Sequence, residues 1–299
     1  MLKSSIKPLN CISRQLLNNT PVIGKLLRFI VLGDTHIIAS TTGELGKNAS
    51  LYNKILFEVN FRKDNNSFNP NFIIHGGDVV DKGDDQASFE LFYQLTYDEL
   101  IHKGVPVFIS IGNHDYDITK SNPDFGNFRR FIGKTRDEVH IPGTKVIYIY
   151  LNTHYCSKRS SLEPALYSYF SSKKNEDIDF LKKMNSSNLY LIDFHNPFRF
   201  KECNDIIHQD DNYYLQWHQK KLFRNSVNSN VKVCAIFSHH MHTMKKFKFD
   251  FNNHPSKVPF LISGKGGNCS STTNYGSYYE VTLDMSTSKI EFNQITIPI

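Results

Sequence analysis

Residues 29–36 read Phe-Ile-Val-Leu-Gly-Asp-Thr-His, an apolar run that ends in glycine and is followed at once by polar side chains. A short apolar run bounded by glycine is typical of a buried strand. We therefore predict a strand over residues 29–32 that presents Asp34 and His36 just beyond its carboxyl end.

The same order of residues recurs four more times along the chain. Apolar runs at 71–75, 105–111, 189–194 and 231–237 are each followed by Asp, Asn or His. The segments that follow them read Gly76-Gly77-Asp78, Gly112-Asn113-His114-Asp115, His195-Asn196-Pro197 and His239-His240-Met241-His242. In an open α/β sheet the carboxyl ends of the strands lie along one edge, where binding sites form. We expect these side chains to meet there.

Helical patterns separate the strands. Apolar residues recur at helical spacing within 49–63, 86–103, 178–184 and 213–224, whereas 145–151 and the region from 259 onward are strand-like. Alternation of strands and helices predicts α/β layers, and the terminal strands indicate a mixed or antiparallel sheet. The sequence contains no internal repeat and no low-complexity linker. It therefore favours one domain over 28–299, preceded by a basic segment over 1–27.

The residue types at the strand ends favour a metal centre. Carboxylate, imidazole and amide oxygen together suit borderline divalent ions such as Zn, Mn and Fe. There are more ligands than one ion can use, which implies two ions, and a carboxylate can bridge two cations roughly 3.5–4 Å apart. Each motif alone is more often structural than ligating. All five together, each after a strand, favour a dinuclear centre.

Composition excludes several classes of protein. The chain has 299 residues, 39% of them hydrophobic and 13% aromatic, which is too apolar for a disordered chain. No apolar run approaches the roughly 18–20 residues that a membrane-spanning helix needs. The five cysteines are odd in number and scattered, so we predict free thiols in a reducing compartment and a cytoplasmic location.

The charge pattern gives little further information. The formal charge is +6, but the Lys and Arg residues are dispersed, so no stable nucleic-acid complex is expected. Residues 1–27 contain basic residues and no acidic residue, a weak likeness to a transit peptide or a membrane-surface helix. We favour a short helix packed on the domain.

At this point the motif set resembles the calcineurin-like metallophosphoesterase superfamily. That pattern runs Asp-x-His, Gly-Asp-x-x, Gly-Asn-His-Asp/Glu, a later His commonly followed by x-Pro, and Gly-His-x-His. The resemblance extends from Arg28 to the C-terminus. It implies a four-layer α/β/β/α sandwich, in which two mixed β-sheets lie between helices. It also implies two divalent or trivalent ions, which could be Mn, Fe, Zn or Ni.

The resemblance also implies residue roles. The first ion is expected to bind Asp34, His36 and His242, and the second Asn113, His195 and His240. Asp78 is expected to bridge the two ions. His114 matches the catalytic His, which would act as general acid, and Asp115 matches its orienting partner.

Two positions depart from the pattern or leave alternatives open. His239 stands where the Gly before His-x-His is usual, so its side chain either clashes at that turn or lines the site. Asp81 stands where purple acid phosphatases have Tyr. It either supports the centre through another ligand or caps the next helix, and we favour the cap.

The implied activity is metal-dependent hydrolysis of a phosphate ester by an activated water, by either a phosphatase or a phosphodiesterase. One alternative is a nuclease with the same centre, which the missing basic stripe disfavours. Another is an inactive scaffold, which the complete ligand set disfavours. Possible substrate contacts are His154, Lys265, Arg129 and Arg130, although helix surface is the favoured interpretation of the two arginines. The sequence leaves the oligomeric state open.

Overall fold

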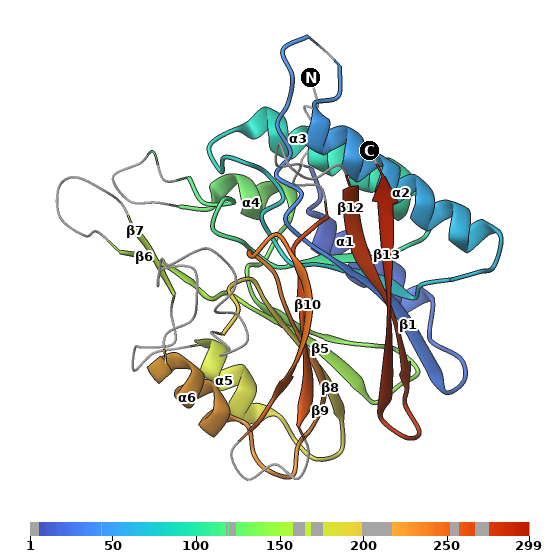
Figure 1. The fold of residues 1–299 in the computed structure, drawn as a ribbon, viewed down its shortest axis with the longest axis vertical. Helices are drawn as coiled ribbons and strands as arrows, with labels where there is room; N and C mark the ends of the chain where they lie inside the picture. Colours follow the sequence, from blue (N-terminus) through green and yellow to red (C-terminus); the bar gives the residue numbers. More distant parts are fainter. Residues whose placement is uncertain are drawn as a thin grey trace.

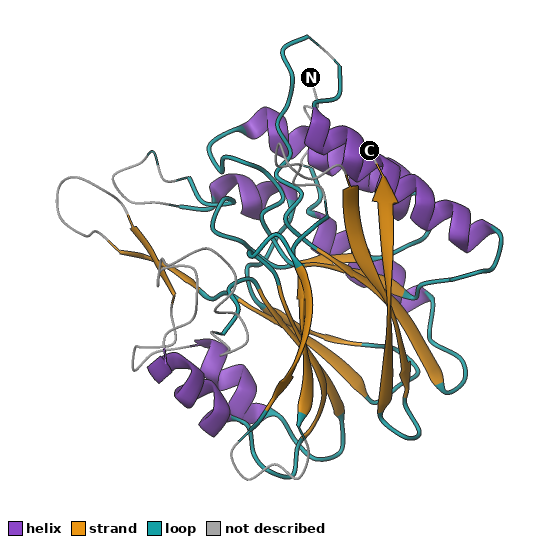
Figure 2. Ribbon diagram, in the orientation of Figure 1, coloured by secondary structure: helices purple, strands orange, loops and turns teal. Residues whose placement is uncertain are grey.

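The computed structural model describes residues 6–42, 44–117, 119, 124–157, 165–168, 176–198, 217–251, 257–266 and 275–298. Two mixed β-sheets of five and six strands pack face to face (Figure 1). Helices cover their outer faces, as the colouring by secondary structure makes clear (Figure 2). The predicted four-layer sandwich is confirmed.

The first sheet has the strand order β13-β12-β1-β2-β3. Its strands are β1 (Leu26–Leu32), β2 (Phe72–His75), β3 (Val107–Ile109), β12 (Tyr275–Asp284) and β13 (Lys289–Pro298). The first three run parallel, and the two C-terminal strands join them antiparallel. The sheet is therefore built from both ends of the chain.

The second sheet has the order β10-β11-β9-β8-β5-β4. Its strands are β4 (Asp137–His140), β5 (Val146–Leu151), β8 (Leu189–Phe194), β9 (Lys232–Ser238), β10 (Met244–Phe249) and β11 (Val258–Ser263). Its four inner strands are parallel and the two edge strands antiparallel. A separate two-stranded ribbon consists of β6 (His154–Ser157) and β7 (Ala165–Ser168).

Two sets of helices cover the sheets. The first sheet carries α1 (Leu9–Asn19), α2 (Lys47–Asp64), α3 (Gln86–Thr96) with the π-helical turn η1 (Tyr97–Ile101), and α4 (Gly126–Phe131). The second carries α5 (Glu176–Lys183) and α6 (Trp217–Ser226). Within the described ranges, no helix combines the length and hydropathy needed to cross a membrane.

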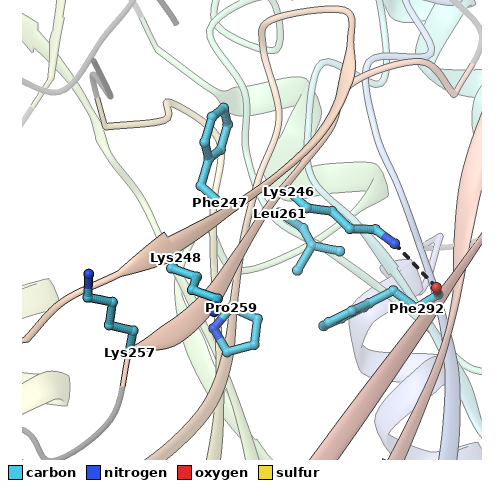
Figure 3. Close-up of a pocket in the computed structure, with 7 residues that line it drawn as sticks. All are labelled: Lys246, Phe247, Lys248, Lys257, Pro259, Leu261 and Phe292. Atoms are coloured by element: carbon cyan, nitrogen blue, oxygen red, sulfur yellow. Dashed lines mark hydrogen bonds between the residues drawn. The ribbon is translucent and has the colours of Figure 1, made fainter. Parts of the chain in front are cut away.

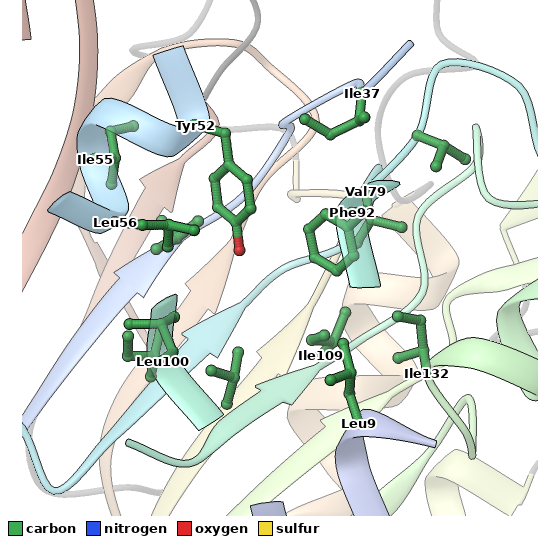
Figure 4. Close-up of a cluster of buried hydrophobic side chains, with 14 of the residues drawn as sticks. Leu9, Ile37, Tyr52, Ile55, Leu56, Val79, Phe92, Leu100, Ile109 and Ile132 are labelled. Atoms are coloured by element: carbon green, nitrogen blue, oxygen red, sulfur yellow. The ribbon is translucent and has the colours of Figure 1, made fainter. Parts of the chain in front are cut away.

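The alternation of side chains along β1 explains how four layers share three hydrophobic interfaces. Phe29 and Val31 point into the cluster between the sheets. Ile30 and Leu32 point the other way, into the cluster beneath α1–α4, part of which Figure 4 shows around Tyr52. Successive residues of a strand face opposite sides, so a continuous apolar run is what a strand buried on both faces requires.

Helix α1 completes the open edge of β3. The side chain of Asn10 donates to the carbonyl of Ile109 at 3.0 Å and accepts from its amide at 2.9 Å, as a neighbouring strand would. Ser13 accepts from the amide of Val107 at 2.9 Å. The N-terminal segment is thus packed on the fold, although the domain boundary at residue 27 stays a prediction.

Candidate metal centre

The predicted ligands come from five strand ends and lie together in the structure. Three groups of side chains each have ligand atoms within 4.8 Å of one another; one is His36, Asp81 and His114, and the other two consist of predicted ligands. Of these two, the first group is Asp34, His36 and His242, and the second is Asp78, His195 and His240. Asn113 joins the second group, because its Oδ1 lies 3.1 Å from Nε2 of His195. Each group combines residues that follow strands of both sheets.

The backbone at these positions is strained. Five predicted ligands have φ in the left-handed region: 59° at Asp34, 45° at His36, 49° at Asp78, 68° at His240 and 45° at His242. Such conformations cost non-glycine residues on the order of 1–3 kcal/mol each and cluster at functional sites. Only two other non-glycine residues of the described chain have positive φ. The strain is therefore concentrated where the ligand atoms converge.

In the first group, two imidazole nitrogens and one carboxylate oxygen face one another. The Nε2 atoms of His36 and His242 lie 3.1 Å apart. Oδ1 of Asp34 is 3.9 Å from the former and 3.6 Å from the latter. Both carboxylate oxygens of Asp34 also accept the amide of His240 at 3.0 Å, which ties the first group to the second.

In the second group, His195 has a fixed orientation. Its Nδ1 donates to the carbonyl of Gly76 at 2.7 Å, so Nε2 is the nitrogen left to bind a metal. That atom lies 3.2 Å from Nδ1 of His240 and 3.1 Å from Oδ2 of Asp78. The bond to Gly76 also connects β8 of one sheet to the end of β2 of the other.

Asp78 lies between the two groups. Its Oδ2 is 3.5 Å from Nε2 of His36 and 3.1 Å from Nε2 of His195, and it makes no hydrogen bond in the part of the chain that the structure describes. Its Oδ1 accepts the amide of His114 at 2.8 Å. A buried carboxylate oxygen without a hydrogen bond is costly, and a cation would satisfy it. The residues fit a pair of cations with Asp78 between them.

Electrostatics at the site favour positive charge. Burial lowers the pKa of His195, but the negative charges of Asp78 and Asp34 raise it more, to about 10. The pKa of His36 is also raised: burial opposes the shift, while Asp81, Asp78 and Asp34 outweigh it. Because metal ions compete with protons for such nitrogens, a field that holds protons here also attracts cations.

His114 lies beside the first group with a partly exposed side chain. Its ring packs edge-on against His36, with centroids 4.5 Å apart. Its Nδ1 donates to the backbone carbonyl of Asp81 at 2.7 Å and lies 4.0 Å from the carboxylate of the same residue. The carboxylate is also 3.7 Å from Nδ1 of His36. Asp81 therefore contacts both His114 and a predicted metal ligand.

Asp115 occupies a different place from the one the sequence suggested. It is fully buried, and its carboxylate accepts the backbone amides of Gly112, Asp78 and Val79 at 2.8–2.9 Å. The pKa of Asp115 is raised to about 7, mainly by burial and to a smaller extent by the charge of Asp78. Asp115 thus holds together the loops after β2 and β3, whereas the ring nitrogen of His114 faces Asp81.

The favoured helix-cap role of Asp81 is wrong. The N-cap of α3 is Asp85, whose side chain accepts the amide of Ser88. An Asp directly before a helical pattern is a common N-cap, and Asp85 directly precedes the helix expected from residue 86. The carboxylate of Asp81 instead lies near His36 and His114.

His239 neither clashes nor lines the opening of the site. It is completely buried. Its Nε2 lies 2.8 Å from Oδ1 of Asp193, and its Nδ1 lies 2.7 Å from the carbonyl oxygen of Ser263. The side chain is beneath the centre rather than at its entrance.

The remaining candidate substrate-binding residues lie in the loop after β11, on α4 and at the start of β6. Lys265 donates to the hydroxyl of Tyr275 at 2.8 Å, in a loop whose Gly266 amide bonds to the carbonyl of Gly33. Arg129 and Arg130 are exposed on α4, where they contact Phe125 and Gln86. His154 begins β6, and its side chain lies outside what the structure describes.

A cavity of about 580 Å³ lies elsewhere, against β10, β11 and β13 (Figure 3). Its lining residues are Lys246, Phe247, Lys248, Lys257, Pro259, Leu261 and Phe292. They include none of the predicted ligands and no carboxylate or histidine. This cavity is therefore separate from the candidate metal centre.

Comparison with known proteins identifies the family. A model for calcineurin-like phosphoesterases matches residues 27–244. The chain belongs to this family. The matched range contains every predicted ligand and His114. A search of curated proteins returned no match.

Several solved structures are similar to this member of the family. A purple acid phosphatase from yellow lupin (Lupinus luteus) is 12% identical, with a TM-score of 0.57, and the match covers 93% of this chain and 55% of that one. A 5'-nucleotidase from Candida albicans is 14% identical, with a TM-score of 0.48, covering 92% and 53%. A phosphopantetheinyl hydrolase from Mycobacterium tuberculosis is 11% identical, with a TM-score of 0.41, covering 81% and 91%.

The calcineurin-like phosphoesterase described here spans about half the length of the first two of these proteins. The likeness to the lupin enzyme supports the fold. Family membership and the His/Asp clusters together support a divalent metal centre and, in general terms, a metallophosphoesterase-type hydrolase.

Proposed function

We propose that this protein hydrolyses phosphate esters with two metal ions, the first held by Asp34, His36 and His242 and the second by Asn113, His195 and His240. Asp78 bridges them. The observation that carries the proposal is the position of Oδ2 of Asp78, within 3.5 Å of a ring nitrogen from each group and without a hydrogen bond among the described residues.

When bound, two cations would offset the negative charge of a phosphoryl group and supply an activated water near neutral pH. The protein's own contribution is to fix the ligand atoms before substrate arrives. The carbonyl of Gly76 orients His195 through a hydrogen bond from Nδ1, and strained backbone conformations position five of the other six ligands. Preorganised groups of this kind need no rearrangement during the reaction.

His114 is proposed as the general acid. Because its Nδ1 donates to the carbonyl of Asp81, Nε2 is the atom that would hold the transferable proton. The partly exposed ring can reach an ester oxygen leaving the phosphorus. Asp81 would keep the ring in position through this hydrogen bond.

The test is hydrolysis by protein that has been stripped of metal and then reloaded separately with Mn, Fe, Zn or Ni. p-Nitrophenyl phosphate reports monoester cleavage, and bis-p-nitrophenyl phosphate reports diester cleavage. We expect turnover of at least one substrate that depends on reloading and is lost in Asp78→Ala. An absence of turnover with all four metals and both substrates contradicts the proposal. Digestion of single-stranded DNA distinguishes the nuclease alternative.

A further inference from the structure

His239 directly precedes the proposed ligand His240 and occupies a position that commonly holds glycine in the motif. Its two ring nitrogens make short contacts to Asp193 and to the carbonyl of Ser263, at 2.8 and 2.7 Å. Asp193 in turn accepts a hydrogen bond from the hydroxyl of Tyr148 at 3.2 Å. All of these groups are buried, so the contacts are shielded from water.

The ring of His239 lies flat against two glycines of the opposite sheet. A Cβ atom built on Gly76 would fall 1.8 Å from the ring, and one built on Gly33 would fall 2.5 Å from it. Gly33 directly precedes Asp34, and Gly76 lies two residues before Asp78. The ring therefore occupies the space that these glycines leave open, at the junction between the sheets.

Hydrogen-bond chemistry limits the charge of this group. The carbonyl of Ser263 can only accept, so Nδ1 of His239 donates. One further proton then lies between Nε2 and the carboxylate of Asp193, whichever atom carries it. In either arrangement the pair is electrically neutral, so it adds no net charge to the metal centre. Its contribution must come from where it holds the chain.

We propose that His239 and Asp193 form a brace that sets the separation of the two metal sites. On one sheet the brace is joined directly to His240 and, through Phe194 of β8, to His195. On the other it contacts the glycines that position Asp34 and Asp78. The proposal rests on the proposed function, since it assumes that the centre binds two ions. His239 is a positioning residue and has no contact with substrate.

The experiment titrates metal-stripped protein with Mn²⁺, counts bound ions, and records the electron paramagnetic resonance spectrum of the coupled pair. We compare wild type with His239→Leu, which keeps apolar volume, and His239→Gln, which keeps a donor for one of the two acceptors. In His239→Leu we expect one ion to bind about 10- to 100-fold more weakly and the coupled spectrum to change. His239→Gln should be intermediate, and both variants should lower kcat more than they raise KM.

A matched control separates positioning from general stability. Leu283→Ala removes volume from the buried cluster between the sheets, where Leu283 pairs with Leu27 at the start of β1, the opposite end of that strand from Asp34. It should lower the melting temperature and leave both metal affinities and the coupled spectrum unchanged. If Leu283→Ala weakens the same ion equally, or if His239→Leu binds two ions as wild type does, the brace is ruled out. If wild type itself does not bind two ions, the proposed metal centre fails first.

A second variant keeps the test valid if His239→Leu does not fold. Gly76→Ala leaves the His239–Asp193 pair intact chemically but pushes a methyl group into the ring. We expect it to weaken metal binding as His239→Leu does, and we expect His239→Ala to restore part of that loss in the double variant. Equal metal binding by Gly76→Ala and wild type would contradict the geometry on which the brace depends.

Discussion

The Nε2 atoms of His36 and His242 lie 3.1 Å apart, although the two residues are 206 positions apart in the sequence. Two imidazole nitrogens in such close contact cannot both carry a proton without repelling each other. A cation between them would bind both lone pairs instead. We therefore expect the stability of the protein to depend on metal.

Removal of metal should therefore lower the melting temperature, and reloading should restore it. A ligand that binds only the folded state stabilises it by about 2.7 kcal/mol when its concentration is 100 times its Kd. Differential scanning calorimetry over a series of Mn²⁺ concentrations measures this shift. In Asp78→Ala we expect Mn²⁺ to raise the melting temperature by a smaller amount than in wild type. A melting temperature that is independent of metal in wild type would contradict the assignment.

Metal binding should release protons at pH 7.5. With the pKa of His195 raised to about 10 in the stripped protein, its imidazole is protonated at that pH, whereas a metal ligand must be neutral. By linkage, this histidine's stabilisation of the stripped protein is complete below pH 6.5 and is lost as pH rises toward 10. Calorimetric titration in buffers of different ionisation enthalpy counts the protons. Zero release would contradict the prediction.

His114→Ala should reduce kcat by roughly 10²- to 10⁴-fold while bound metal stays unchanged. The loss should be largest for alkyl phosphates, whose leaving oxygen needs a proton, and smaller for p-nitrophenyl phosphate. His140→Ala is a matched control, because His140 is an exposed histidine at the end of β4 whose ring contacts the carboxylate of Glu138. Joint loss of metal and activity in His114→Ala would make His114 a ligand or a structural residue.

Asn10→Leu should destabilise the fold by about 2–4 kcal/mol without changing the activity of the remaining folded protein. The substitution leaves the buried amide and carbonyl of Ile109 without the partners that Asn10 provides, and each such loss costs about 1–3 kcal/mol. Urea unfolding measures the change. The neighbouring exposed substitution Cys11→Ser should stay within about 0.5 kcal/mol. Equal stability of the two variants would argue against the edge contact.

Cys234 should resist alkylation in the native protein. Burial raises the pKa of its thiol to about 12, against the ordinary value of 9.0, so its thiolate fraction at pH 8 falls from about 10⁻¹ to about 10⁻⁴. The exposed Cys11 should react with iodoacetamide under the same conditions. Peptide mass spectrometry before and after denaturation distinguishes them. Rapid native labelling of Cys234 would contradict its burial.

Local patterns in the sequence predicted the parts of the fold that are buried on both faces. The run 29–32 is apolar without interruption because β1 packs between helices and the other sheet. The edge strands of the second sheet escaped prediction: β10 reads Met-Lys-Lys-Phe-Lys-Phe and β4 reads Asp-Glu-Val-His. Their exposed faces carry charged residues, so the apolar signal of a strand is diluted.

The sequence predicted which residues lie at the site better than it predicted which of them contact one another. Asp34, His36 and Asp78 are recognisable because they follow apolar runs. The assignment of Asp81 and Asp115 depends on which loop lies against which, and sequence spacing contains no such information. Similarly, the helix expected over 86–103 ends at Thr96 and continues as a π-helical turn over Tyr97–Ile101, a change of hydrogen-bond register that side-chain periodicity does not reveal.

The strand order of the first sheet has a consequence for how the protein is made. β1 ends at Leu32, yet one of its two neighbours in the sheet is β12, which begins at Tyr275 and is therefore synthesised much later. The ligand set likewise stays incomplete until His242 has been synthesised. If the proposed metal centre is correct, both ions must be captured after β9 has been made, because a nascent chain halted before β9 would lack His240 and His242, one proposed ligand of each ion.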